Sequence, residues 1–68
     1  MNEKSFIKSR LALKQMTMNE LAEMMTKISG KNYTRDSLNG KFYRGTLSVN
    51  EMHLIAQILD FSIEYKIL

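Results

Sequence analysis

Capping signals at the starts of helices constrain this chain more than any other feature of its sequence. The segments TMNE at 17–20 and SVNE at 48–51 are capping boxes, in which the first hydroxyl and the glutamate each accept a hydrogen bond from the other residue's backbone N–H. Thr34 is a third N-cap, although serine rather than glutamate stands at position 37, and Asn2 is a fourth. Helices are therefore expected to begin at these four points.

Glycine marks two of the helix ends. Gly30 and Gly45 can adopt the left-handed backbone conformation that terminates a helix, and the chain has no proline to interrupt one. Between these signals, apolar residues recur at intervals of three and four, as in helices with one buried face. The sequence predicts an all-α fold with helices over about 3–14, 18–29, 35–44 and 49–59. The expected core residues of the last three helices are Leu21, Ala22, Met25, Ile28, Leu38, Phe42, Met52, Ile55, Ala56, Ile58 and Leu59.

Length and composition indicate one small domain over 1–68. A chain of 68 residues has a core that only just offsets the entropy of folding. It contains no cysteine, so neither a disulfide nor a thiolate metal site can reinforce that core. No apolar run approaches the length of a bilayer span, and the N-terminus lacks the apolar stretch of a signal peptide. We therefore expect a soluble cytoplasmic protein without a membrane partner.

The segment 61–67 departs from the helical pattern. Its apolar and polar residues alternate, which favours a short C-terminal β-strand. A single strand needs a second one, so we expect an antiparallel ribbon between two copies of the chain, a homodimer. The residues expected at this dimer interface are Phe61, Ile63, Tyr65 and Ile67. Two alternatives remain open: a helical tail, since Ile58, Phe61 and Tyr65 are also three or four residues apart, and a tail folded onto its own core.

Positive charge is concentrated in the middle of the chain. Residues 27–46 contain five lysines or arginines and one aspartate, whereas the net charge of the whole chain is +3. This region includes the expected third helix, which has a capped start and a narrow apolar edge formed by Leu38 and Phe42. A helix that enters a DNA groove requires these features. The sequence therefore predicts a helix-turn-helix unit over 17–45.

The other faces of the third helix define the predicted DNA contacts. Side chains on the outward strip can hydrogen-bond to base edges, and cations beside it can neutralise phosphates. The expected base contacts are Arg35, Asp36, Asn39, Gly40 and Tyr43. Helix starts present free N–H groups and a positive dipole end, which also favour phosphate. The expected phosphate contacts are Thr17, Asn19, Lys31, Thr34, Ser37, Lys41 and Arg44.

Some of these residues have simpler explanations. Thr17, Asn19 and Thr34 lie at helix starts, where capping alone would account for them. Glycine inside a helix costs about 1 kcal/mol relative to alanine. Either another surface approaches Gly40 closely, or the helix merely tolerates it.

Three parts of the chain carry a resemblance to a known family. They are IKSRL at 7–11 with MTMNELAE at 16–23, TRDSLNGKFYRGTL at 34–47, and the apolar run 51–61. In this order they resemble the first two helices, the recognition helix and the fourth helix of the Cro and lambda-repressor superfamily. The resemblance covers nearly the whole chain and implies a transcriptional regulator, a repressor of the phage or mobile-element type, that binds double-stranded DNA. It implies base contacts at Arg35, Asp36 and Asn39.

The chain differs from that family in two places. Met18 stands where the family commonly has a glutamine that contacts DNA. The stretch from Ala22 to Leu38 is longer than is usual there. We therefore expect a longer second helix or a wider turn, and an orientation of the third helix that cannot be copied from the family.

The main alternative is a protein-binding use of the same fold, as in an antitoxin-like or anti-repressor module. Asp36 on the outward strip favours it, because phosphate repels a carboxylate, whereas Arg35 and Lys41 favour DNA. Catalysis is not expected, since the chain has no cysteine, a single histidine at His53, no glycine-rich phosphate loop and no metal-ligand spacing. No cofactor, metal or small-molecule substrate is therefore predicted.

Overall fold

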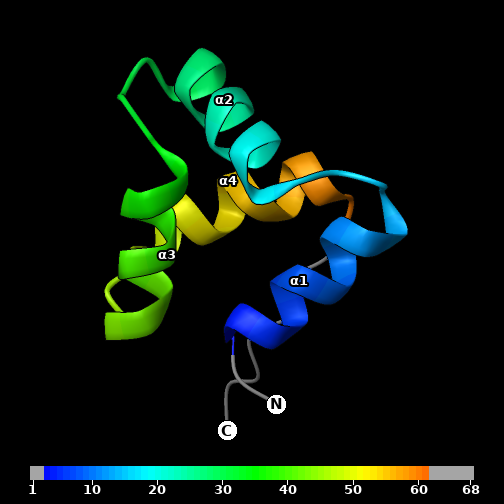
Figure 1. Cartoon of the computed structure of the whole chain (residues 1–68). Helices are drawn as coiled ribbons and strands as arrows, with labels where there is room; N and C mark the ends of the chain where they lie inside the picture. Colours follow the sequence, from blue (N-terminus) through cyan, green and yellow to red (C-terminus); the bar gives the residue numbers. More distant parts are fainter. Residues whose placement is uncertain (1–2, 62–68) are drawn as a thin grey trace, which may run out of the picture.

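The computed structural model describes residues 3–61, which form four helices. They are α1 (Glu3–Leu13), α2 (Met18–Ser29), α3 (Arg35–Arg44) and α4 (Val49–Leu59). The predicted helices are confirmed, and only α1 ends one residue earlier than expected. Figure 1 shows α4 running across the centre of the molecule, from α3 on one side towards α1 on the other. Within the described part, no helix combines the length and the apolar character needed to cross a membrane.

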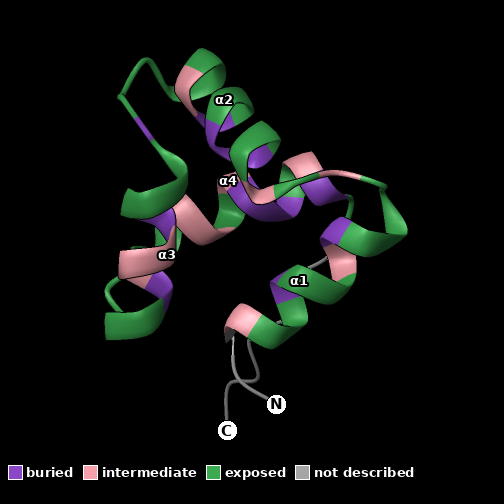
Figure 2. Ribbon diagram, in the orientation of Figure 1, coloured by how far each residue is buried: buried purple, intermediate pink, exposed green. Residues whose placement is uncertain are grey.

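All four helices contribute side chains to one hydrophobic core. Its completely buried large side chains are Ile7, Leu21, Met25, Leu38, Ile55 and Leu59. Burial of such a side chain stabilises the fold by roughly 1.5–3 kcal/mol. Ile28 was expected in this core, but 55% of its surface is exposed. It lies in the last turn of α2, which extends past the region where the other helices pack together (Figure 2).

The three capping sites that the structure describes are formed as expected. Thr17 and Ser48 each accept a hydrogen bond from the N–H of the glutamate three residues later, at 3.1 Å in both cases. At the start of α3, Ser37 acts in place of a glutamate. Its Oγ accepts a hydrogen bond from the Thr34 N–H at 3.0 Å, and Thr34 Oγ1 accepts one from the Ser37 N–H at 3.1 Å. The two terminating glycines have φ values of 75° and 65°, so both are left-handed C-caps.

The C-terminal β-strand predicted over 61–67 is wrong. The part of the chain that the structure describes contains helices and no strand. Instead, Asp60 ends α4 in the left-handed conformation, with φ of 55°, and the Phe61 N–H donates a hydrogen bond to the Ala56 carbonyl at 3.0 Å. This C-cap turns the backbone out of the helix axis and directs Phe61 back towards α1.

Phe61 packs against the core of its own chain, and it does not extend a strand towards a second copy. Its ring meets the ring of Phe6 edge to face, with centroids 5.0 Å apart. The Arg10 guanidinium lies 5.7 Å from the Phe61 centroid and donates a hydrogen bond to the Asp60 carbonyl at 3.0 Å. These contacts within the chain make a partner strand unnecessary at this position. The other residues assigned to the strand interface lie outside the described residues: Ile63, Tyr65 and Ile67.

Candidate nucleic-acid interface

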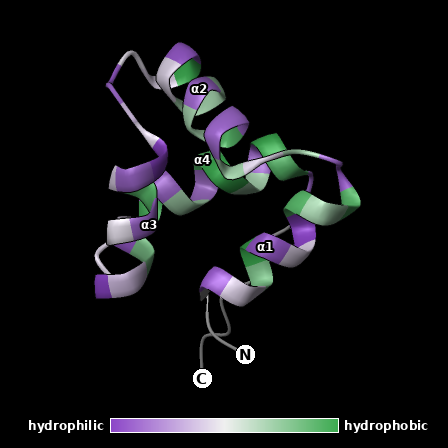
Figure 3. Cartoon of the chain, viewed as in Figure 1, coloured by the Kyte–Doolittle hydropathy of each residue, from purple (hydrophilic) through white to green (hydrophobic). Residues whose placement is uncertain are grey.

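α3 is the helix with the most hydrophilic surface, whereas α4 is mostly hydrophobic (Figure 3). Only Leu38 and Phe42 of α3 are buried, and both belong to the core. A helix anchored by one narrow edge leaves most of its circumference available for other contacts. Tyr43 of this helix is almost fully exposed, with 89% of its surface accessible to solvent.

The predicted base contacts divide between two faces of α3. Arg35 and Asn39 line a groove between α3 and α1. Tyr43, Asp36 and Gly40 follow in that order around the helix, towards the side away from the core, as the helical rotation of 100° per residue requires. The structure thus places these five residues on one continuous surface of α3.

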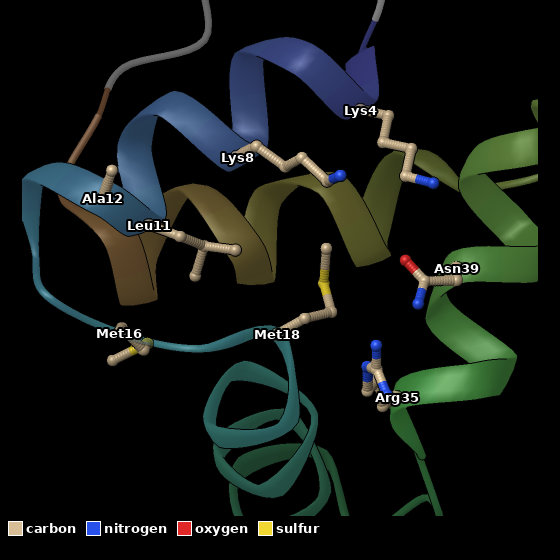
Figure 4. Close-up of a pocket in the computed structure, with 8 residues that line it drawn as sticks. All are labelled: Lys4, Lys8, Leu11, Ala12, Met16, Met18, Arg35 and Asn39. Atoms are coloured by element: carbon tan, nitrogen blue, oxygen red, sulfur yellow. The ribbon is translucent and has the colours of Figure 1, made fainter.

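The groove between α1 and α3 has a volume of about 460 Å³. Figure 4 shows Lys4 and Lys8 extending from α1 towards α3, where Arg35 and Asn39 face them. The lining residues with apolar side chains are Leu11, Ala12, Met16 and Met18. Among the residues that the structure describes, three cations and no carboxylate therefore line this groove.

Lys4 and Lys8 were missed as candidates by the sequence analysis. The available signal was their spacing of four residues, which places them on one face of a helix. That spacing alone is equally typical of a solvated helix surface. Only the packing of α1 beside α3 shows that this face is turned towards Arg35.

The opposite side of α3 contains a closed network around Glu51. The Tyr33 hydroxyl donates a hydrogen bond to Glu51 Oε2 at 2.8 Å, and Lys41 Nζ lies 3.3 Å from the same oxygen. Glu51 Oε1 accepts a hydrogen bond from the Ser48 N–H at 2.9 Å. Lys41, a predicted phosphate contact, is therefore held in an ion pair with α4.

This network determines how Glu51 and Tyr33 titrate. Burial raises the pKa of Glu51, but the hydrogen bonds from Ser48, Tyr33 and Lys41 and the charge of Lys41 outweigh it and lower the pKa to about 2. The pKa of Tyr33 is raised, first by burial and then by the hydrogen bond and the negative charge of Glu51. At neutral pH the network therefore contains a carboxylate and a neutral phenol.

The long connection between α2 and α3 is attached to the core at Tyr33. The Tyr33 N–H donates a hydrogen bond to Thr26 Oγ1 at 2.9 Å, and the same hydroxyl lies 3.1 Å from the Tyr33 carbonyl. The Tyr33 ring is also buried in the core. Together with the bond to Glu51, these contacts fix the position at which the chain enters α3. Lys31 is an exposed residue of this connection and lies near Ser37 and Lys41.

In the described structure, the nearest atoms to a Cβ at Gly40 come from its own helix and not from a neighbouring element. A Cβ atom at this position would lie 3.1 and 3.2 Å from the two terminal nitrogens of Arg44. The Arg44 side chain is exposed and flexible, so it can move away at little cost. Among the described residues, no backbone or core side chain requires glycine here.

The remaining predicted phosphate contacts lie at helix starts. The side chains of Thr17, Thr34 and Ser37 all form the capping hydrogen bonds at their helix starts. Asn19 is exposed in the first turn of α2, with its amide 3.4 Å from a carboxylate oxygen of Glu23. Their contact with phosphate stays a prediction. Over residues 3–61, no three His, Asp or Glu side chains are grouped so that they could hold a metal ion.

Comparisons with known proteins assign the chain to a family but do not indicate its function. A search of curated proteins found no match, and a search of solved structures found none either. A family described as "Domain of unknown function (DUF6471)" matches residues 2–63, which include all four helices and the groove between α1 and α3. Because the match covers nearly the whole sequence, the chain belongs to the DUF6471 family.

Proposed function

We propose that this protein binds double-stranded DNA in a sequence-specific manner, with α3 in the major groove, and that it acts as a small transcriptional regulator of the repressor type. The observation that carries the proposal is the exposed surface of α3, where Arg35 and Asn39 lie side by side in a cationic groove. The buried edge of α3 is narrow and its start is capped, so the helix presents this surface in a fixed orientation.

The dimensions and side chains of α3 suit this role. An α-helix with its side chains is about 10–12 Å in diameter, and the major groove of B-DNA is about 12 Å wide. Arginine pairs with the O6 and N7 atoms of guanine, and asparagine pairs with N6 and N7 of adenine. Arg35 and Asn39 are four residues apart on one face, so both side chains can reach neighbouring bases of one half-site.

Two residues of the same surface favour a second candidate function, a protein-binding module. Asp36 is exposed on the surface that would enter the DNA groove, between the two phosphate backbones, and Tyr43 is almost fully exposed. Tyrosine is enriched in protein interfaces, and a carboxylate is repelled by DNA. Replacement of Asp36 by asparagine distinguishes DNA binding from protein binding. The change should strengthen DNA binding, because it removes a negative charge. It should weaken or leave unchanged the binding of a cationic protein partner.

Selection of bound sequences from random DNA, followed by titration, tests the proposal. We expect a preferred sequence to emerge, and a palindromic one if two copies of the chain bind together. The substitutions Arg35→Ala and Asn39→Ala should each weaken binding to that sequence by about 1–3 kcal/mol, and weaken binding to random DNA much less. Lys27→Ala and Gln57→Ala, at exposed positions outside this surface, are the matched controls. Equal losses on both DNAs would show that the two residues contact only the backbone.

A further inference from the structure

We propose that the groove between α1 and α3 binds the sugar-phosphate backbone of one DNA strand, with Lys4 and Lys8 as its phosphate contacts. This inference rests on the proposed function and extends the DNA-binding surface from α3 to α1. The structural basis is that Lys4 and Lys8 face Arg35 and Asn39 across the groove (Figure 4).

The charges of the groove favour an anion. Lys4 and Lys8 are one helical turn apart, and Arg35 approaches from the other wall. In the described part of the chain, none of these three cations forms an ion pair, whereas Lys14 pairs with Asp60 and Lys41 pairs with Glu51. Like charges that converge without a counter-charge repel each other, so a bound anion would be stabilised by all three.

The position of the groove favours DNA over a free anion. The two backbones of a DNA duplex lie on either side of a helix in the major groove. The groove runs along one side of α3 and shares Arg35 and Asn39 with the proposed base-reading surface. A backbone in this groove would therefore be continuous with the bases that α3 reads.

The apolar part of the groove also suits a nucleotide backbone better than inorganic phosphate. Met18 lies between the two walls, where its partly exposed side chain presents carbon and sulfur atoms (Figure 4). A deoxyribose has carbon atoms that can pack on such a surface, whereas a free phosphate ion has none. The lysines would bind the phosphates, and the apolar side chains would contact the sugar between them.

The experiment measures the salt dependence of DNA binding by the full chain. The native protein and the double variant Lys4→Gln/Lys8→Gln are titrated with the selected duplex between about 50 and 200 mM salt. Log K falls as log salt rises, and each lost phosphate contact should make this negative slope shallower by about 1. The slope of the double variant should therefore be shallower by about 2. The matched control is Lys14→Gln/Lys27→Gln, which removes the same charge outside the groove, and circular dichroism checks that both variants are folded.

The outcomes separate this inference from the proposed function. A salt dependence that becomes shallower in the groove variant and not in the control supports the inference. An unchanged slope, or an equal fall in the control, overturns it while DNA binding itself stands. If the native chain binds no duplex, the proposed function fails and the inference fails with it. If inorganic phosphate raises the melting temperature of the native protein but not of the groove variant, while both have the same DNA slope, the groove binds a free anion and the inference is overturned.

Discussion

The two sides of α3 use their cations in different ways. On the α4 side, Lys41 is paired with Glu51, and the Tyr33 hydroxyl binds the same carboxylate. On the α1 side, Arg35 faces Lys4 and Lys8 across a groove that no carboxylate of the described side chains lines. Both sides look equally basic in the sequence.

From this difference we expect a cation to contribute most to a binding surface where the fold leaves it without a counter-charge. The Glu51 network orients α3 against α4, and its internal pairing reduces the attraction of Lys41 for an external anion. In the α1 groove no described ion pair neutralises Lys4, Lys8 or Arg35, so these cations can attract an external anion. We therefore assign the α4 side to stability and the α1 side to binding.

The largest expected effect is on stability, at Glu51. Its pKa is lowered to about 2 in the folded state from an ordinary value of 4.5. Because the folded pKa is the lower one, this stabilisation is present above pH 4.5 and is lost as the pH falls towards 2. The shift corresponds to about 3 kcal/mol, and denaturant unfolding of the native protein at a series of pH values should show a loss of that order across this window.

The variant Glu51→Gln tests the origin of this pH dependence. Glutamine can still complete the capping box, but it cannot form the ion pair with Lys41. We expect the variant to be less stable at neutral pH by about 2 kcal/mol, and to lose much less stability between pH 5 and 2. The matched control is Glu23→Gln, at an exposed position of α2. An unchanged pH profile in Glu51→Gln would mean that other carboxylates determine the acid stability.

A smaller effect is expected at Gly40, which lies between the two sides of α3. Alanine favours the helix by about 1 kcal/mol over glycine, and only the flexible end of Arg44 must move to make room. The substitution Gly40→Ala should therefore raise the free energy of unfolding by about 0.5–1 kcal/mol. Affinity for the selected duplex should fall if DNA approaches this position closely. Unchanged affinity in a more stable variant would mean that the helix merely tolerates glycine.

The smallest effect is expected for the salt dependence of binding when Lys41 is replaced. Because Glu51 already pairs with Lys41, the substitution Lys41→Gln should change the slope of log K against log salt by less than 1. Lys31→Gln, on the same side but without an ion pair in the described structure, should lower it by about 1. If both variants reduce the salt dependence of binding by the same amount, Lys41 leaves Glu51 when DNA binds. The two sides of α3 are then more alike than the free protein indicates.

The ends of the helices followed from the sequence because each signal acts over three or four residues. Thr17 and Ser48 meet their glutamates within one helical turn, so no distant residue is needed for the caps to form. Sequence reasoning was less successful at the C-terminus. The alternation over 61–67 is typical of a strand, but Phe61 has an apolar partner in Phe6, which is far away in the sequence.

The sequence predicted the exposed residues of α3, but not which cations of other helices lie beside them. Arg35 and Asn39 could be placed on the exposed part of α3 from helical periodicity, since a helix buries one edge and exposes the rest. Nothing local distinguishes Lys41, which is paired, from Lys4 or Lys8, which line the groove. That distinction depends on which helices are neighbours, and long-range packing of apolar faces decides it.

The sequence by itself determined four helices, their caps and a narrow apolar edge on α3, because these features depend on residues within a few positions of one another. Only the tertiary structure decided which cations are neutralised and which remain available. The core places Glu51 of α4 beside Lys41 and places α1 beside Arg35. Electrostatic interactions fall off with distance through space, not along the chain, so the charge of the binding surface is a property of the folded protein.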